Sequence, residues 1–259
     1  MAVDFTRAVT NNMPASLDQH SMSLTNYAGN IPSSSEVEGI EIRMLQPLIK
    51  NNKTLKIWPF PGKARLYSLT MVISDISNQL VGMMDLNTFS GVGDNEYLPI
   101  NKTIYYWQST NAESKAPNQV HVMSAIIKSK EQLREVGTIL SKVKEDTGYK
   151  GLMDQLSSIV ADAVPFSSVT NIAMQLAGIV GQYLGKVEDS PLGTVVNSFT
   201  CLHGDWDRVG VSPIRMNTPN VDFDFELIVR DSKRELQTEN STAPAIPGNH
   251  PPSYQMMPM

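Results

Sequence analysis

The hydrophobic period changes twice along this chain, and that change constrains the fold more than any other feature. Residues 39–128 contain four segments rich in the β-branched and aromatic residues that favour strands: GIEIRML, ARLYSLTMVISDI, NKTIYYWQS and NQVHVMSAIIK. A second strand-rich block begins near residue 194, and its clearest segment, NVDFDFELIVRD, alternates apolar and polar residues as a half-buried strand does. Between the two blocks the apolar spacing becomes helical. The sequence therefore predicts a mainly β protein with helices in its middle.

The middle block predicts three helices. Ser129 and Gln132 match a capping box, apolar residues then keep helical spacing up to Thr147 and Gly148, and a second periodic segment follows at once. The third segment, residues 168–185, carries small residues at every fourth position, which lets another element approach closely: Ala173, Ala177, Gly181 and Gly185.

Strands, then helices, then strands favour an antiparallel β-sandwich over an alternating parallel sheet, because no crossover helices separate successive strands. We predict a C2-like or jelly-roll-like layout with a helical insertion at about 129–186. The sandwich forms one domain over residues 37–230. Residues 1–36 are expected to be a flexible N-terminal arm, and residues 231–259, which are polar and proline-rich, a disordered tail.

Composition limits the class of protein and its compartment. The hydrophobic share of 41% and charged share of 18% are those of a globular chain, and the net charge of -5 argues against a general polyanion binder. Cys201 is the single cysteine, so no intramolecular disulfide forms, and the first residues lack the apolar core of a signal peptide. We therefore expect a cytoplasmic or other intracellular protein.

One stretch departs from the acidic balance. Residues 42–74 contain no acidic side chain but interleave cations with aromatic rings, and the candidate partner-binding residues are Lys50, Lys53, Lys56, Trp58, Phe60, Lys63 and Arg65. Such a mixture can bind anionic lipid or can hold a nucleic-acid backbone while rings stack on bases. The alternative is that Trp58 and Phe60 plug the end of the sandwich while the lysines protect strand edges. We expect an interaction or assembly module.

Two acidic stretches suggest metal binding. The segment SFTCLHGDWDRVG places Cys201, His203, Asp205 and Asp207 two residues apart, a spacing that favours a strand running into a turn over a zinc site or a nucleophile. The rival hypothesis is a metal-dependent enzyme built on these residues. We expect no cofactor, with calcium as the alternative. Loops of a β-sandwich can bring carboxylates together around calcium, and the candidates here are Asp85, Asp94, Glu96, Asp205 and Asp207.

The remaining motifs concern partners. No nucleotide-binding, hydrolase or metalloprotease motif occurs, which favours a non-enzymatic protein. Pro251, Pro252 and Tyr254 match a short ligand of WW-type domains. Residues 168–185 are uncharged, so conditional membrane insertion, as in a pore-forming or viral structural protein, is a third hypothesis. We also expect a homo-oligomer.

Overall fold

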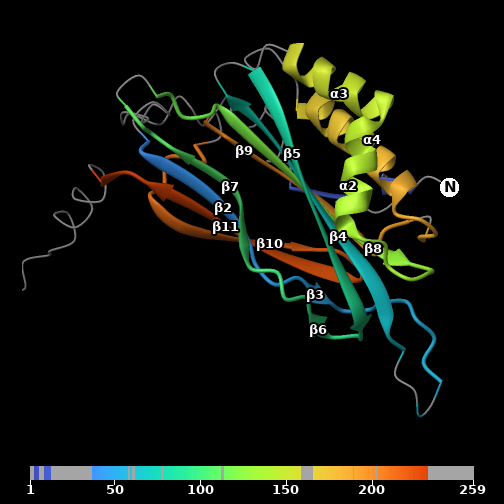
Figure 1. Ribbon diagram of the computed structural model, residues 1–259. Coiled ribbons are helices and arrows are strands. Elements are labelled where there is room, and N and C mark those ends of the chain that lie inside the picture. Colours follow the sequence, from blue (N-terminus) through green and yellow to red (C-terminus); the bar gives the residue numbers. More distant parts are fainter. Residues whose placement is uncertain are drawn as a thin grey trace, which may run out of the picture.

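The computed structural model describes residues 3–5, 9–12, 37–57, 59, 62–76, 79–111, 114–158, 166–188, 190–201 and 204–232. Two sheets pack on one another, and three helices cover the other face of one of them (Figure 1). The prediction of a mainly β protein with helices between two strand blocks is confirmed.

Sheet A is the five-stranded sheet that carries the helices, with strand order β1-β9-β8-β4-β5. All its pairs are antiparallel except β1 with β9, which run parallel. Its strands are β1 (Val9–Asn12), β4 (Ala64–Ile76), β5 (Gln79–Val92), β8 (Gln119–Ser129) and β9 (Gly193–Thr200).

Sheet B has the order β6-β3-β11-β2-β7, with β10 on the other side of β11, and all its pairs are antiparallel. Its strands are β2 (Gly39–Met44), β3 (Leu48–Ile49), β6 (Glu96–Tyr97), β7 (Lys102–Gln108), β10 (Gly210–Asn217) and β11 (Val221–Arg230). The alternating segment expected to be a half-buried strand is β11. Its apolar face is buried between the sheets: Val221, Phe223, Phe225, Leu227 and Val229.

Two hydrophobic cores share sheet A. One lies between the sheets, and the other lies between sheet A and helices α2 (Val136–Glu145), α3 (Thr147–Ser158) and α4 (Phe166–Tyr183). Strand β8 is therefore buried on both faces: Val120, Val122 and Ile126 face sheet B, while Met123 and Ala125 face the helices. Burial on both faces explains why β8 reads as a nearly continuous apolar run.

Gly181 of α4 packs against Val3 and Phe5 near the start of the chain. A Cβ atom at Gly181 would lie 3.0 Å from Val3 Cγ2 and 3.6 Å from Phe5 Cε2, so only glycine leaves ordinary room for this contact. Val3 and Phe5 are buried there, and β1 extends sheet A beside β9. Two pieces of the 1–36 segment thus belong to the fold, which the expectation of a flexible arm did not include. They are too short to show a period.

Helix α4 packs against sheet A through Val169, Ile172, Leu176 and Val180. Among the described residues, no helix has both the length and the hydropathy that crossing a bilayer requires. Conditional insertion of residues 168–185 stays a prediction.

Candidate functional site

The basic stretch is split between a loop and the strands on either side of it. Lys50 directly follows β3, residues 51–63 connect β3 to β4, and Arg65 lies within β4. We call residues 51–63 the β3–β4 loop. It leaves the body of the molecule at the lower right of Figure 1.

Asn52 fixes the base of the β3–β4 loop. Its side-chain amide is fully buried and donates hydrogen bonds to the carbonyls of Gly62 (2.7 Å) and Val92 (2.8 Å). Its side-chain oxygen accepts the Thr54 N–H at 2.8 Å, and its own N–H donates to Asp94 Oδ1 at 2.7 Å. One side chain therefore ties both arms of the loop to the end of β5.

The two arms also touch at Gly62. A Cβ atom there would lie 2.8 Å from the Thr54 carbonyl oxygen and 2.9 Å from that of Leu55, distances that no real side chain tolerates. Backbone therefore packs on backbone at the base of the loop.

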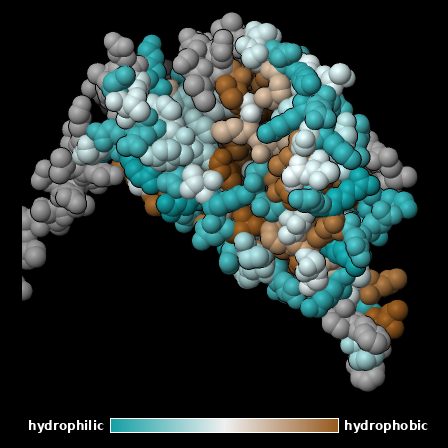
Figure 2. Space-filling view, viewed as in Figure 1, coloured by the Kyte–Doolittle hydropathy of each residue, from teal (hydrophilic) through white to brown (hydrophobic). Residues whose placement is uncertain are grey.

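Beyond this base, apolar side chains stand in solvent. Leu55 is 87% exposed and Ile57 is 69% exposed, the two largest values among the exposed large hydrophobic residues that the structure describes. Figure 2 shows hydrophobic surface at the lower right, where the loop leaves the molecule. Leu55 and Ile57 are thus two exposed aliphatic residues close together in sequence, on a loop whose base is fixed.

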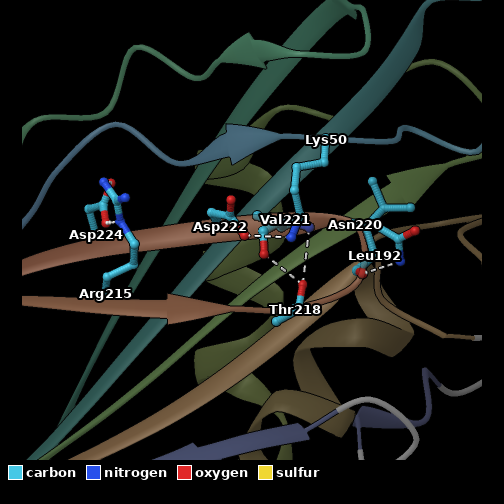
Figure 3. A network of polar contacts seen from close by, with 8 residues as sticks. All are labelled: Lys50, Leu192, Arg215, Thr218, Asn220, Val221, Asp222 and Asp224. Atoms are coloured by element: carbon cyan, nitrogen blue, oxygen red, sulfur yellow. Dashed lines mark hydrogen bonds and ion pairs between the residues drawn. The ribbon is translucent and has the colours of Figure 1, made fainter.

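The cations of the site fall into two groups. Lys50 Nζ lies 2.6 Å from Asp222 Oδ1 on β11, as Figure 3 shows, and Lys56 Nζ lies 2.5 Å from Asp94 Oδ2. The hydrogen bond from the Asn52 N–H, together with the Lys56 ammonium, holds the pKa of the Asp94 carboxyl below its ordinary value. These two lysines are therefore neutralised and hold the loop in place.

Lys53, Lys63 and Arg65 form the other group. All three are exposed, and none has an acidic partner within the described part of the chain. Lys128, which comes from β8, donates to the Lys53 carbonyl at 2.7 Å and adds a cation that the sequence interpretation missed. The sequence does place Lys128 directly after the apolar run of β8, at the end of that strand. Trp58 and Phe60 lie outside the described residues.

The five candidate calcium ligands are not brought together. Asp85 lies within β5, where it pairs with Lys102 and accepts the Asn87 amide at 2.7 Å, while Asp94 and Glu96 lie beyond the far end of that strand. Asp205 and Asp207 lie at the opposite end of sheet A, next to the point where Thr200 pairs with Gln119. Along the strands this end is about 30 Å from the end near Asp94. No cluster of three or more metal-ligating side chains occurs among the described residues.

The segment around Cys201 forms the end of a strand and a turn. Strand β9 ends at Thr200, Gly204 adopts a left-handed φ of 73°, and Asp205 Oδ2 accepts the Thr200 N–H at 2.7 Å. Trp206 is buried between the sheets and donates its ring N–H to the Pro117 carbonyl at 3.0 Å. Its role in the core was missed, because nothing in the sequence shows which side of a turn a tryptophan faces. His203, Pro251, Pro252 and Tyr254 lie outside the described residues.

A buried serine–histidine pair was also missed. His121 Nδ1 lies 2.5 Å from the Ser198 hydroxyl on β9, and Nε2 lies 2.9 Å from Gln119 Oε1. Burial lowers the pKa of His121 to about 4, so the imidazole is a weak base at neutral pH. Both residues are buried, and the pair therefore fits a role in the core better than nucleophilic catalysis.

No protein-family model, curated protein or solved structure matches this chain.

Proposed function

We propose that this protein is a non-enzymatic interaction or assembly module that binds anionic membrane surfaces through the β3–β4 loop. The exposure of Leu55 and Ile57 beside Lys53 and Lys63, on a loop held at its base by Asn52, carries the proposal. Apolar side chains would enter the interface between headgroups and acyl chains while the ammonium groups stay with the lipid phosphates.

The aliphatic side chains favour lipid over nucleic acid. Single-stranded nucleic acid is held by stacking on aromatic rings, and neither leucine nor isoleucine offers a ring. In a bilayer, by contrast, burying each aliphatic side chain stabilises the complex by about 1.5–3 kcal/mol. Each cation near an anionic surface adds about 1 kcal/mol. We therefore expect weak, reversible and salt-dependent binding.

Cosedimentation with vesicles tests the proposal. We expect the protein to bind vesicles that contain phosphatidylserine in phosphatidylcholine, and to bind phosphatidylcholine alone much less. A Leu55→Ser/Ile57→Ser variant should lose at least about tenfold in partition coefficient, because two aliphatic side chains no longer enter the bilayer. A Lys53→Glu/Lys63→Glu variant should lose most of the dependence on anionic lipid and salt.

Matched controls lie elsewhere on the surface. Val211→Ser removes an apolar side chain on β10 that is 53% exposed, and Lys142→Glu/Lys150→Glu reverses two exposed charges on α2 and α3. Neither should change lipid binding. The proposal fails if wild-type protein ignores anionic vesicles at low salt, or if it binds a single-stranded oligonucleotide through the same lysines while Leu55→Ser/Ile57→Ser has no effect.

Other predictions accompany this proposal. The C2-like or jelly-roll-like layout, the intracellular location, a calcium site and WW-domain binding by the C-terminal motif stay predictions, as does the rival metal-dependent enzyme. Metal content after native purification separates that rival from the membrane module, because the enzyme hypothesis requires stoichiometric metal.

A further inference from the structure

Strand β5 is a long outer strand whose free edge has no described partner. It ends the strand order of sheet A and pairs on its other side with β4 over most of its 14 residues. Within the described ranges, no strand pairs with its outer edge. An edge of this kind presents unpaired backbone N–H and C=O groups that readily pair with another strand.

Three other outer strands carry features that discourage pairing, whereas β5 has only a register irregularity near Gly91, close to its C-terminal end. Strand β1 has only four residues, β10 contains Pro213 and Arg215, and β7 begins with Lys102. Proline and lysine on edge strands are common means of preventing edge-to-edge association. From residue 79 to 92, β5 contains neither proline, lysine nor arginine.

Two apolar side chains of β5 are partly exposed next to this edge. Val81 is 37% exposed and Met83 is 41% exposed, while on the opposite face of β5 Gly82 lies against the thioether of Met153 from α3. Figure 2 shows hydrophobic surface across the middle of the molecule in the view in which β5 faces the reader in Figure 1. The helices therefore cover one face of the strand, while on the face toward sheet B Val81 and Met83 are partly exposed, because β5 is the outermost strand.

The charges at this edge do not oppose the approach of an identical edge. Asp85 is the single charged residue of β5, and its carboxylate pairs with the Lys102 ammonium and accepts the Asn87 amide. Two such edges would therefore meet without net repulsion, which suits self-association.

The size of the strand sets the expected strength. Fourteen residues extend for about 45 Å, and a strip about 10 Å wide along them gives roughly 900 Å² of buried surface for the pair. Stable interfaces bury about 1,200–2,000 Å², so this contact is expected to be weak and reversible.

We propose that the outer edge of β5 is an interface between two copies of this chain, which pair β5 with β5 in antiparallel orientation about a two-fold axis. Sheet A would then continue across the dimer, and Val81 and Met83 would be covered. The outer edge of β5 would then be the contact surface of the homo-oligomer that the sequence analysis expects. The proposal does not depend on membrane binding.

Sedimentation equilibrium without lipid tests the dimer. The mass of the wild-type protein should rise from 28.6 kDa toward twice that value with increasing concentration, and amide hydrogen exchange of residues 79–92 should slow in parallel. A Val81→Lys/Met83→Lys variant should remain monomeric with an unchanged melting temperature, because a charge on an exposed edge opposes pairing without entering the core.

Val211→Lys is the control, since it places a lysine on another outer strand, β10, and it should dimerise like wild type. Wild-type protein that stays at the monomer mass at every concentration would overturn the proposal. Dimerisation of Val81→Lys/Met83→Lys at wild-type strength would overturn it equally.

Discussion

Burial of the His121 imidazole makes the free energy of unfolding depend on pH. The pKa of His121 falls from its ordinary value of 6.5 to about 4 in the folded protein. Between these values the unfolded chain binds more protons than the folded one, so acidification favours unfolding. The contribution is complete above pH 6.5 and is lost as the pH falls toward 4. We expect a loss of about 3 kcal/mol over that interval, measured by urea unfolding at several pH values.

Replacing the imidazole isolates this effect. The His121→Gln side chain keeps polar atoms near Ser198 but cannot titrate. The free energy of unfolding should therefore change less with pH between pH 4.5 and 6.5 than it does in the wild type. Burial raises the pKa of Glu41, but hydrogen bonds from Thr103, Arg230 and Arg43 outweigh it and hold the pKa at about 2. Glu41 therefore affects the free energy of unfolding mainly below pH 4.5, outside this interval. An equal slope in His121→Gln would assign the pH dependence to other groups.

Single residues that bridge distant segments could not be predicted from the sequence. Asn52 bonds Val92, which lies 40 positions away, and His121 bonds Ser198, which lies 77 away. Composition did locate the cluster of cations, because Lys53 and Lys63 occur in a stretch without acids. It could not show that Lys50 and Lys56 are paired, since their acidic partners come from other parts of the chain.

At the scale of elements, two glycines of α4 make a matched pair. A Cβ atom at Gly178 would meet nothing within 4 Å, whereas one at Gly181 would meet Val3 at 3.0 Å. Gly178→Ala should therefore stabilise the protein by about 0.5–1 kcal/mol, through helix propensity alone. Gly181→Ala should gain less or destabilise, because Val3 must move.

Chemical denaturation of the two variants measures the difference, and hydrogen exchange of β1 reports whether the first residues stay in place. Equal stabilisation by both substitutions would show that Val3 and Phe5 do not pack closely on α4 in solution.

Long elements were predictable, and their ends were not. The alternating pattern of β11 and the small residues at every fourth position of α4 indicate element type directly, because side chains recur on one face with the period of the backbone. The capping box at Ser129 was wrong: α2 begins at Val136 after Glu135 without a side-chain cap, and Ser129 ends β8, where its hydroxyl accepts the Glu131 N–H. Strand β1 has four residues, too few for a period to be seen.

At the scale of the whole molecule, the two cores should unfold together. Both bury a face of the same strands, β4, β8 and β9, so neither the helices nor sheet B can detach without exposing sheet A. We expect far-ultraviolet circular dichroism and the fluorescence of Trp206, which is in the core, and Trp107, which packs against it, to report one transition in urea, measured in a Trp58→Phe background. Two separate midpoints would show that the helical layer is an independent folding unit.

The order of strands and helices along the chain predicted this layering only in outline. Helices inserted between β8 and β9, which are neighbours in sheet A, must return to the same sheet, and covering its outer face is the direct way to do so. The sequence could not show that β11 pairs with β2, because these two strands lie at opposite ends of the strand-forming part of the chain.

The buried amide of Asn52 also determines when the entropy of ordering the β3–β4 loop is lost. Fixing a backbone residue costs about 1–2 kcal/mol, and a loop that orders only on contact incurs this cost during association. Here the base is already fixed by bonds to Gly62 and Val92 when the protein folds. Part of the conformational entropy of the loop is therefore lost during folding and not during binding. A modest apolar contact can then give measurable affinity.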